Sequence, residues 1–290
     1  MSNNNVEAVR ATNPFSRDNS NILQITIVNS QTLSTGTKLK INPRGMLTGS
    51  LRNANDGITY FGYIDPEGDD ETTVDYVLPP KYVPNGKGEN ENNKIEKYSG
   101  RYFQIAYNSV LKEYYLRDLG NGLGTFVKIK TQMILKDNSL INIGDSYLVV
   151  NFDPPLEKTE GNEEGTIESR YQGIGRKLIV NLYDEKRDNQ KKTYSFTPGA
   201  KIIRVGRRKY GNDIELEDSL VSKVNSNIPY HEKEGWVIRD GNEICSPTGE
   251  IISQTSTNGT WFLAIEDFRI YDGLIFKGHF NLFCCNFVKH

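Results

Sequence analysis

The sequence is poor in cysteine, histidine, methionine and tryptophan, and it lacks a long hydrophobic run. Its 290 residues include 3 Cys, 3 His, 3 Met and 2 Trp. A small, odd number of cysteines without a secretory signal indicates a reducing compartment, so an intracellular location, cytoplasmic or nuclear, is expected. No stretch of about 18 apolar residues occurs, so no transmembrane helix is expected. The three histidines are scattered without metal-ligand spacing, and no metal site is predicted.

Two of the cysteines, Cys284 and Cys285, are adjacent. Neighbouring side chains on a β-strand point to opposite faces. The pair therefore predicts one buried and one exposed thiol, in preference to a pair of metal ligands.

The charges nearly cancel. Lys and Arg number 35, Asp and Glu number 37, and the net charge is −2. Neither nucleic acid nor an anionic membrane is therefore expected as a partner of the whole chain, although a local basic patch is compatible with this balance. Aromatic residues make up 10% of the sequence, with 16 Tyr and 12 Phe, which is enough to build cores and excludes global disorder.

Short segments of alternating polarity, separated by Gly, Asn, Pro and Asp, recur along the chain. In Leu23–Val28 the apolar residues Leu23, Ile25 and Ile27 alternate with Gln24 and Thr26, as in a half-buried strand. Similar segments are Thr59–Ile64, Tyr76–Leu78, Tyr102–Ala106, Tyr114–Leu116, Thr125–Ile129, Ser146–Phe152 and Lys177–Tyr183. Many short strands without a long helical period predict an all-β sandwich or barrel.

A break in this rhythm divides the chain. Residues 1–21 are polar and are expected to form a tail. Asp153-Pro154-Pro155 ends one strand, and an acidic, Gly-containing stretch follows. We therefore expect a linker at 153–175 between β-domains at 22–152 and 176–290.

Two polar stretches interrupt the first half. Asp65–Asp75 is acidic, but a calcium loop of the EF-hand type would need Gly where Asp70 stands and Glu where Tyr76 stands. A solvated turn is expected instead. Asn85–Lys94, with the sequence NGKGENENNK, is expected to be a long exposed loop.

The two halves share an order of motifs. The second half contains Gly206-Arg207, Asn212-Asp213-Ile214, Val221–Ile228, a strand ending at Asp240, and Ser256–Trp261. The first half repeats the later signals in Ser99–Ile105, Tyr115–Asp118 and Gly122–Phe126. This order resembles the forkhead-associated (FHA) family twice, over roughly 22–152 and 176–288. The resemblance implies two FHA-type β-sandwich domains in tandem, whose loops at one end bind phosphothreonine peptides.

The resemblance also assigns site residues in the second half. Arg207 would bind the phosphate, Ser222 would donate its hydroxyl to it, and Lys223 would lie beside it. Thr257 and Asn258 would line the peptide, with the Asn258 amide bonding its backbone. A phosphothreonine carries about −1.5 to −2 charges and three acceptor oxygens, which a guanidinium and hydroxyl donors satisfy. The alternative is that Arg207 and Ser222 only brace loops.

The sequence departs from the family pattern in several places. Asn225 stands where the family has a loop-supporting histidine, and an amide could partly replace it. The stretch between Asp240 and Ser256 is long, and Ile244-Cys245 and Ile251-Ile252 flank Ser-Pro-Thr-Gly, which predicts an extra hairpin.

The first half lacks most of the family's binding residues. Its Gly-Arg position is Gly62-Tyr63, its asparagine position is Leu123 and its histidine position is Tyr102, whereas Ser99 is kept. We therefore expect the first half to retain the fold, to lose the phosphate site and to dock constitutively.

No catalytic signature is present. Gly120–Gly124 has spaced glycines, but strands flank it on both sides, so a hairpin turn is favoured over a nucleotide-binding loop.

The sequence thus predicts a non-enzymatic adaptor without a cofactor, whose partners are a phosphothreonine-containing protein and a large protein assembly. The alternative is a purely structural subunit. The Asn- and Lys-rich usage resembles that of ciliate proteins and suggests a cytoskeletal or ciliary setting such as the axoneme.

Overall fold

The computed structural model describes residues 22–52, 54–64, 73–80, 99–154, 172–184, 191–245 and 251–288. Regular structure in these residues consists of β-strands, so the predicted all-β fold is confirmed. They contain no helix long and apolar enough to cross a membrane. The expected tail at 1–21, most of the acidic turn, the Asn85–Lys94 loop and the middle of the expected linker lie outside the described residues.

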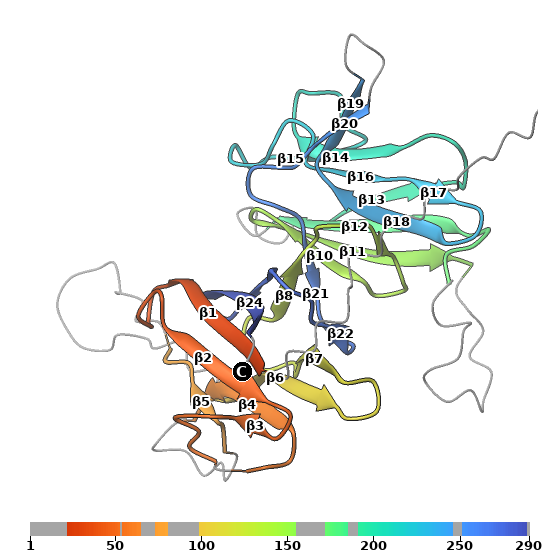
Figure 1. Cartoon of the computed structure of the whole chain (residues 1–290). Helices are drawn as coiled ribbons and strands as arrows, with labels where there is room; N and C mark the ends of the chain where they lie inside the picture. The colour runs from red at the N-terminus through yellow and green to blue at the C-terminus, as the bar shows by residue number, and fades with distance from the viewer. Residues whose placement is uncertain are drawn as a thin grey trace, which may run out of the picture.

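The largest sheet has eleven strands, in the order β13-β12-β11-β10-β21-β8-β23-β24-β1-β2-β3. It runs through the whole molecule (Figure 1). Its strands are β1 (Ile22–Ser30), β2 (Lys38–Asn42), β3 (Gly45–Met46), β8 (Thr125–Lys128), β10 (Leu140–Ile143), β11 (Ser146–Asp153), β12 (Lys177–Asp184), β13 (Lys191–Phe196), β21 (Trp261–Leu263), β23 (Leu274–Gly278) and β24 (Asn281–Val288).

Two smaller sheets and a hairpin complete the described structure. One sheet has the order β22-β7-β6-β4-β5, and the other has β15-β14-β16-β18-β17 with β9 also paired to β18. The strands of the first are β4 (Ile58–Tyr63), β5 (Tyr76–Val77), β6 (Gly100–Asn108), β7 (Glu113–Asp118) and β22 (Phe268–Arg269). Those of the second are β9 (Met133–Ile134), β14 (Ile203–Arg207), β15 (Ile214–Leu216), β16 (Ser226–Ile228), β17 (Tyr230–His231) and β18 (Gly235–Asp240). The hairpin consists of β19 (Asn242–Cys245) and β20 (Ile251–Gln254).

The strand order is symmetric about the paired strands β8 and β21. Outward from β8 the large sheet continues with β23, β24, β1 and β2, and outward from β21 it continues with β10, β11, β12 and β13. The smaller sheets match as well, because β4 pairs with β5 in parallel and β14 pairs with β15 in parallel. The two halves of the sequence therefore supply equivalent strands, in agreement with the repeated motifs.

The last strands of each half pack with the other half. β24 pairs with β1, and β11 pairs with β12. One hydrophobic core accordingly combines residues between Leu23 and Val127 with residues between Ala264 and Cys285, and the second core contains residues between Ile129 and Ile238. The structure thus differs from the expected contiguous division at 152 and 176, because the two halves exchange their three final strands.

The alternation predicted for the first strand is visible in its burial. Leu23, Ile25 and Ile27 are fully buried in the first core. The same periodicity separates the two adjacent cysteines of β24, since Cys285 is buried and Cys284 is partly exposed. The predicted buried thiol is therefore confirmed at Cys285, whereas Cys284 is only partly exposed. Burial raises the pKa of Cys285.

Candidate functional site

Three separate loops bring the predicted site residues of the second half together. Arg207 ends β14, Ser222 and Lys223 lie between β15 and β16, and Thr257 and Asn258 lie between β20 and β21. The backbone N–H of Thr257 donates to Ser222 Oγ at 3.0 Å, and the Ser222 hydroxyl donates to Thr257 Oγ1 at 3.3 Å. Residues 35 positions apart thus form one cluster of hydroxyl groups beside the arginine strand.

Arg207 and Lys223 share one aromatic surface. The guanidinium carbon of Arg207 lies 5.0 Å from the centre of the Tyr210 ring, and the ammonium nitrogen of Lys223 lies 5.2 Å from the same centre. Cations are attracted to ring faces at these distances. Both positive charges are therefore held around the same ring.

The Arg207 guanidinium is not paired with a carboxylate among the described residues. Its Nη1 donates to the carbonyl oxygen of Ser219 at 3.0 Å, and its buried Nε has no partner in the part of the chain that the structure describes. By contrast, the neighbouring Arg208 forms an ion pair with Glu217 at 2.8 Å. Arg207 thus keeps an unneutralised charge and unused donors at the loop cluster.

Asn258 has a bracing contact in this structure. Its side-chain Nδ2 donates to the carbonyl oxygen of Leu220 at 2.9 Å. Its backbone carbonyl oxygen accepts a hydrogen bond from Trp261 Nε1 at 3.0 Å. The amide therefore ties two of the three loops together. A contact of this amide with a peptide backbone stays a prediction.

The backbone beneath the cluster is closely packed. The backbone N–H of Arg207 donates to the carbonyl oxygen of Ser222 at 3.0 Å. Asn212 Nδ2 donates to the carbonyls of Arg207 and Lys223 at 2.9 and 2.7 Å. A Cβ atom on Gly206 would lie 2.4 Å from the Lys223 carbonyl oxygen, so only glycine permits this approach.

Asp240 organises the loop that carries Thr257 and Asn258. Its carboxylate accepts hydrogen bonds from the N–H and hydroxyl of Ser256, at 3.1 and 2.7 Å, and from the hydroxyl of Thr260 at 2.7 Å. Asn225 is fully buried and donates to Thr260 Oγ1 at 3.0 Å. Asn225, which was expected to support the loops, therefore contacts this loop through Thr260.

The extra hairpin predicted from the sequence is present next to this loop. Ile244 pairs with Ile252, and Cys245 pairs with Ile251. Figure 1 shows β19 and β20 projecting from the end of the second half.

The equivalent position in the first half has the same backbone but different side chains. A Cβ atom on Gly62 would lie 2.1 Å from the Gly100 carbonyl oxygen, which reproduces the crowding at Gly206. Tyr63 follows Gly62 and pairs with Gly100, so it stands where the second half has Arg207. Leu123, at the asparagine position, is 39% exposed. The position therefore carries no guanidinium.

Tyr102, at the family's histidine position in the first half, is buried. It stacks on His279 with a ring-centre distance of 4.6 Å. Burial lowers the pKa of His279 to about 4. His279 belongs to the exchanged C-terminal strands, so this aromatic pair joins segments from both halves.

Tyr210 and Lys128 are site residues that were not predicted. Tyr210 directly follows Arg207-Arg208-Lys209, and an aromatic residue next to this basic run is the sequence signal that could have identified it. Lys128 comes from β8, and its side chain lies close to Gly259, with its Nζ 6.0 Å from the Trp261 ring centre. No local pattern predicts Lys128, because its proximity depends on the pairing of β8 with β21.

No family model, curated protein or solved structure matches the chain. The described residues contain no group of three or more His, Cys, Asp or Glu side chains that could hold a metal ion.

Proposed function

We propose that the chain is a non-catalytic adaptor that binds phosphothreonine peptides at the loop cluster of its second half. Arg207 binds two phosphate oxygens, Ser222 donates its hydroxyl to the phosphate, and Lys223 adds a second positive charge. Thr257 and Asn258 lie along the bound peptide. The two halves are proposed to be FHA-type domains.

One observation carries the proposal, namely the unpaired guanidinium of Arg207 beside a second cation and a pair of hydroxyl groups. Arg207 Nη1 donates only to a carbonyl oxygen, and Lys223 shares the Tyr210 ring with it. Charge-assisted hydrogen bonds from a guanidinium to phosphate oxygens are stronger than a bond to a neutral carbonyl. A phosphate therefore replaces the Ser219 contact favourably.

The proposal is tested with a library of peptides centred on phosphothreonine, phosphoserine or threonine, using the complete chain. The complete chain is necessary because each core contains strands from both halves. Selective enrichment of phosphothreonine peptides that weakens with rising salt supports the proposal. Equal enrichment of unphosphorylated peptides rejects it.

A second candidate function is a purely structural subunit of a large assembly, such as a cytoskeletal or ciliary one. The continuous eleven-stranded sheet favours it, because one sheet through both cores makes a rigid spacer. The two candidates differ in phosphopeptide binding, because an adaptor binds phosphothreonine peptides at the loop cluster and a purely structural subunit does not. Phosphatase treatment of the native assembly does not separate them if the first half docks constitutively.

A further inference from the structure

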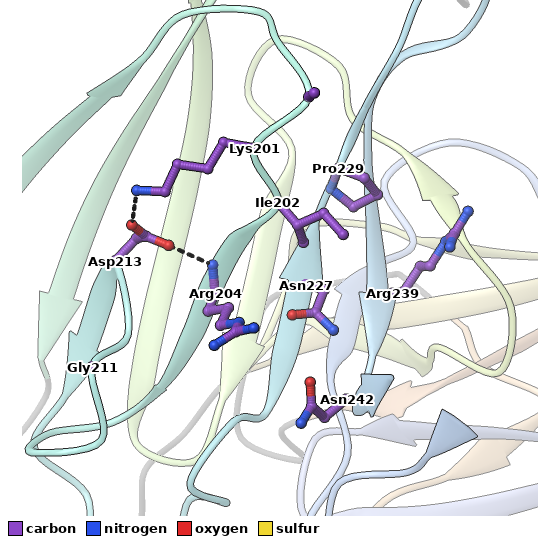
Figure 2. A pocket seen from close by; sticks show the side chains of 10 residues that line it. Lys201, Ile202, Arg204, Gly211, Asp213, Asn227, Pro229, Arg239 and Asn242 are labelled. Atoms are coloured by element: carbon purple, nitrogen blue, oxygen red, sulfur yellow. Dashed lines mark hydrogen bonds and ion pairs between the residues drawn. The ribbon is translucent and has the colours of Figure 1, made fainter. Parts of the chain in front are cut away.

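A groove lies on the sheet that contains β14, β16 and β18, apart from the loop cluster. Its volume is about 510 Å³, which is within the range of about 300–1,000 Å³ typical of ligand sites. Figure 2 shows Arg204, Asn227 and Arg239 following one another along it. They are register neighbours, since Arg204 pairs with Asn227 and Asn227 pairs with Arg239.

The groove carries a surplus of positive charge. Among the described residues that line it, Lys201, Arg204 and Arg239 are cationic and Asp213 is acidic. Asp213 is paired with Lys201 and also accepts the backbone N–H of Arg204 at 3.0 Å. The Arg204 side chain is exposed and has no hydrogen-bond partner among the described residues. Arg239 is held in place by Gln132 Oε1, 2.8 Å from its Nη2.

Asn227 supplies an independent sign that the groove is a site. The residue is 8% exposed, its Nδ2 donates to the Gly241 carbonyl at 3.1 Å, and its Oδ1 is buried and has no hydrogen-bond partner among the described residues. Figure 2 shows the amide between Arg204 and Arg239. A buried acceptor without a donor is unfavourable. A guanidinium has five N–H donors, so Arg204 can donate to Asn227 Oδ1 and to a ligand at the same time.

We propose that this groove binds an acidic peptide segment, with Arg204 as the residue that contacts its carboxylates. The planar guanidinium matches a carboxylate with two parallel hydrogen bonds. Ile202, which is 45% exposed, and Pro229 offer apolar surface to the methylene groups of Glu side chains. The net charge of −2 over the whole chain opposes a nucleic acid, whose phosphates extend far beyond one groove.

The proposal goes beyond the phosphothreonine site, because it uses the strand face and not the loops. It is tested by fluorescence anisotropy of a fluorescein-labelled oligoglutamate peptide with the complete chain. Arg204→Ala is expected to weaken binding roughly tenfold or more. Arg44→Ala, which removes an exposed arginine from the first half, is the charge-matched control and should bind like the wild type.

Asn227→Asp is the second variant. It keeps the shape of the side chain, places a negative charge in the groove and loses the hydrogen bond to the Gly241 carbonyl. It should also weaken binding, and its thermal midpoint is measured to check that it folds. Several outcomes overturn the proposal: no binding by the wild type, equal losses in Arg204→Ala and Arg44→Ala, or a loss in Arg207→Ala alone. Displacement by inorganic phosphate more readily than by free glutamate at matched ionic strength would also reject a carboxylate site.

Discussion

Thr26 in the first strand and Cys284 in the last strand lie directly opposite each other across the β1–β24 pair. Both side chains are partly exposed. If each half kept its own final strands, β1 would pair with β11 and Cys284 would be far from Thr26. This single pair of residues therefore reports on the exchange of strands between the halves.

A disulfide is the corresponding test. Thr26→Cys should form a disulfide with Cys284 under mild oxidation, because facing residues on antiparallel strands have Cα atoms about 4.5–5.5 Å apart, within the range that a disulfide spans. The closed loop spans most of the chain and should raise the free energy of unfolding by about 2–4 kcal/mol. The measurement is a mobility shift on a non-reducing gel together with urea unfolding. Absence of the shift, or its persistence in the Cys284→Ser background, would argue against the exchange.

The buried carboxylate of Asp75 should be critical for the first core. Asp75 is 1% exposed and accepts hydrogen bonds from Ser50 Oγ, Arg52 Nε and the Tyr60 N–H at 2.6, 3.1 and 2.9 Å. Asp75→Ala removes the buried acceptor shared by these three donors and should lower the free energy of unfolding by about 3–5 kcal/mol.

Asp56 provides the matched control. Asp56 also binds Arg52, at 2.6 Å, but its side chain is 45% exposed. Asp56→Ala should therefore cost no more than about 1 kcal/mol in the same urea titration. Similar losses in the two variants would mean that burial of the Asp75 pair is not what matters.

Gly206→Ala should disrupt the close backbone packing that supports the loop cluster. The added Cβ would lie 2.4 Å from the Lys223 carbonyl oxygen and 2.9 Å from the Val224 Cα. Overpacking of this kind costs about 1–3 kcal/mol, and it should also displace Ser222 from Arg207. Gly199→Ala, where nothing lies within 4 Å of the new Cβ, is the control. The midpoint temperature of thermal unfolding and the phosphopeptide affinity should both fall in Gly206→Ala and stay near the wild-type values in Gly199→Ala.

Lys277 should make stability depend on pH. It lies where the two halves join, where it donates to Asn142 Oδ1 and lies 5.1 and 5.0 Å from the ring centres of Phe126 and Trp261. Burial lowers the pKa of Lys277 from 10.5 to about 8. Between these values the unfolded chain binds more protons, so stability should rise with pH, by up to about 3 kcal/mol.

Lys277→Met should remove this dependence. The free energy of unfolding of both proteins is measured by urea titration from pH 7 to about pH 10. The wild-type value minus the variant value should increase as the pH rises. Lys128→Met, which removes a neighbouring cation beside the same Trp261 ring, is the control. A constant difference across this range would show that Lys277 keeps its ordinary titration.

The sequence predicts most of the local structure and the composition of the candidate site. Alternation at Leu23–Val28 locates the first strand, and the two Ile-containing segments around Ser-Pro-Thr-Gly locate the β19–β20 hairpin. The family resemblance also selects Arg207, Ser222 and Thr257, which the structure brings together. These features depend on short-range patterns or on motif order.

The exchange of strands could not be predicted in this way. β11 and β24 have equivalent patterns, and either could pair with β1 without changing the apolar alternation. Lys128 and the groove at Asn227 depend on contacts between distant strands, for which one sequence contains no local signal. Tertiary pairing decides these features, so they emerge only from the structure.

The proposed phosphate site is tested most directly by calorimetry of the complete chain with a phosphothreonine peptide selected from the library. Arg207→Ala should abolish binding, and Arg207→Lys should not restore it, because an ammonium cannot form the two-pronged contact of a guanidinium. Arg208→Ala, which removes an arginine already paired with Glu217, is the control and should bind with nearly normal affinity. Equal affinity of the wild type and Arg207→Ala would contradict the assignment of the site.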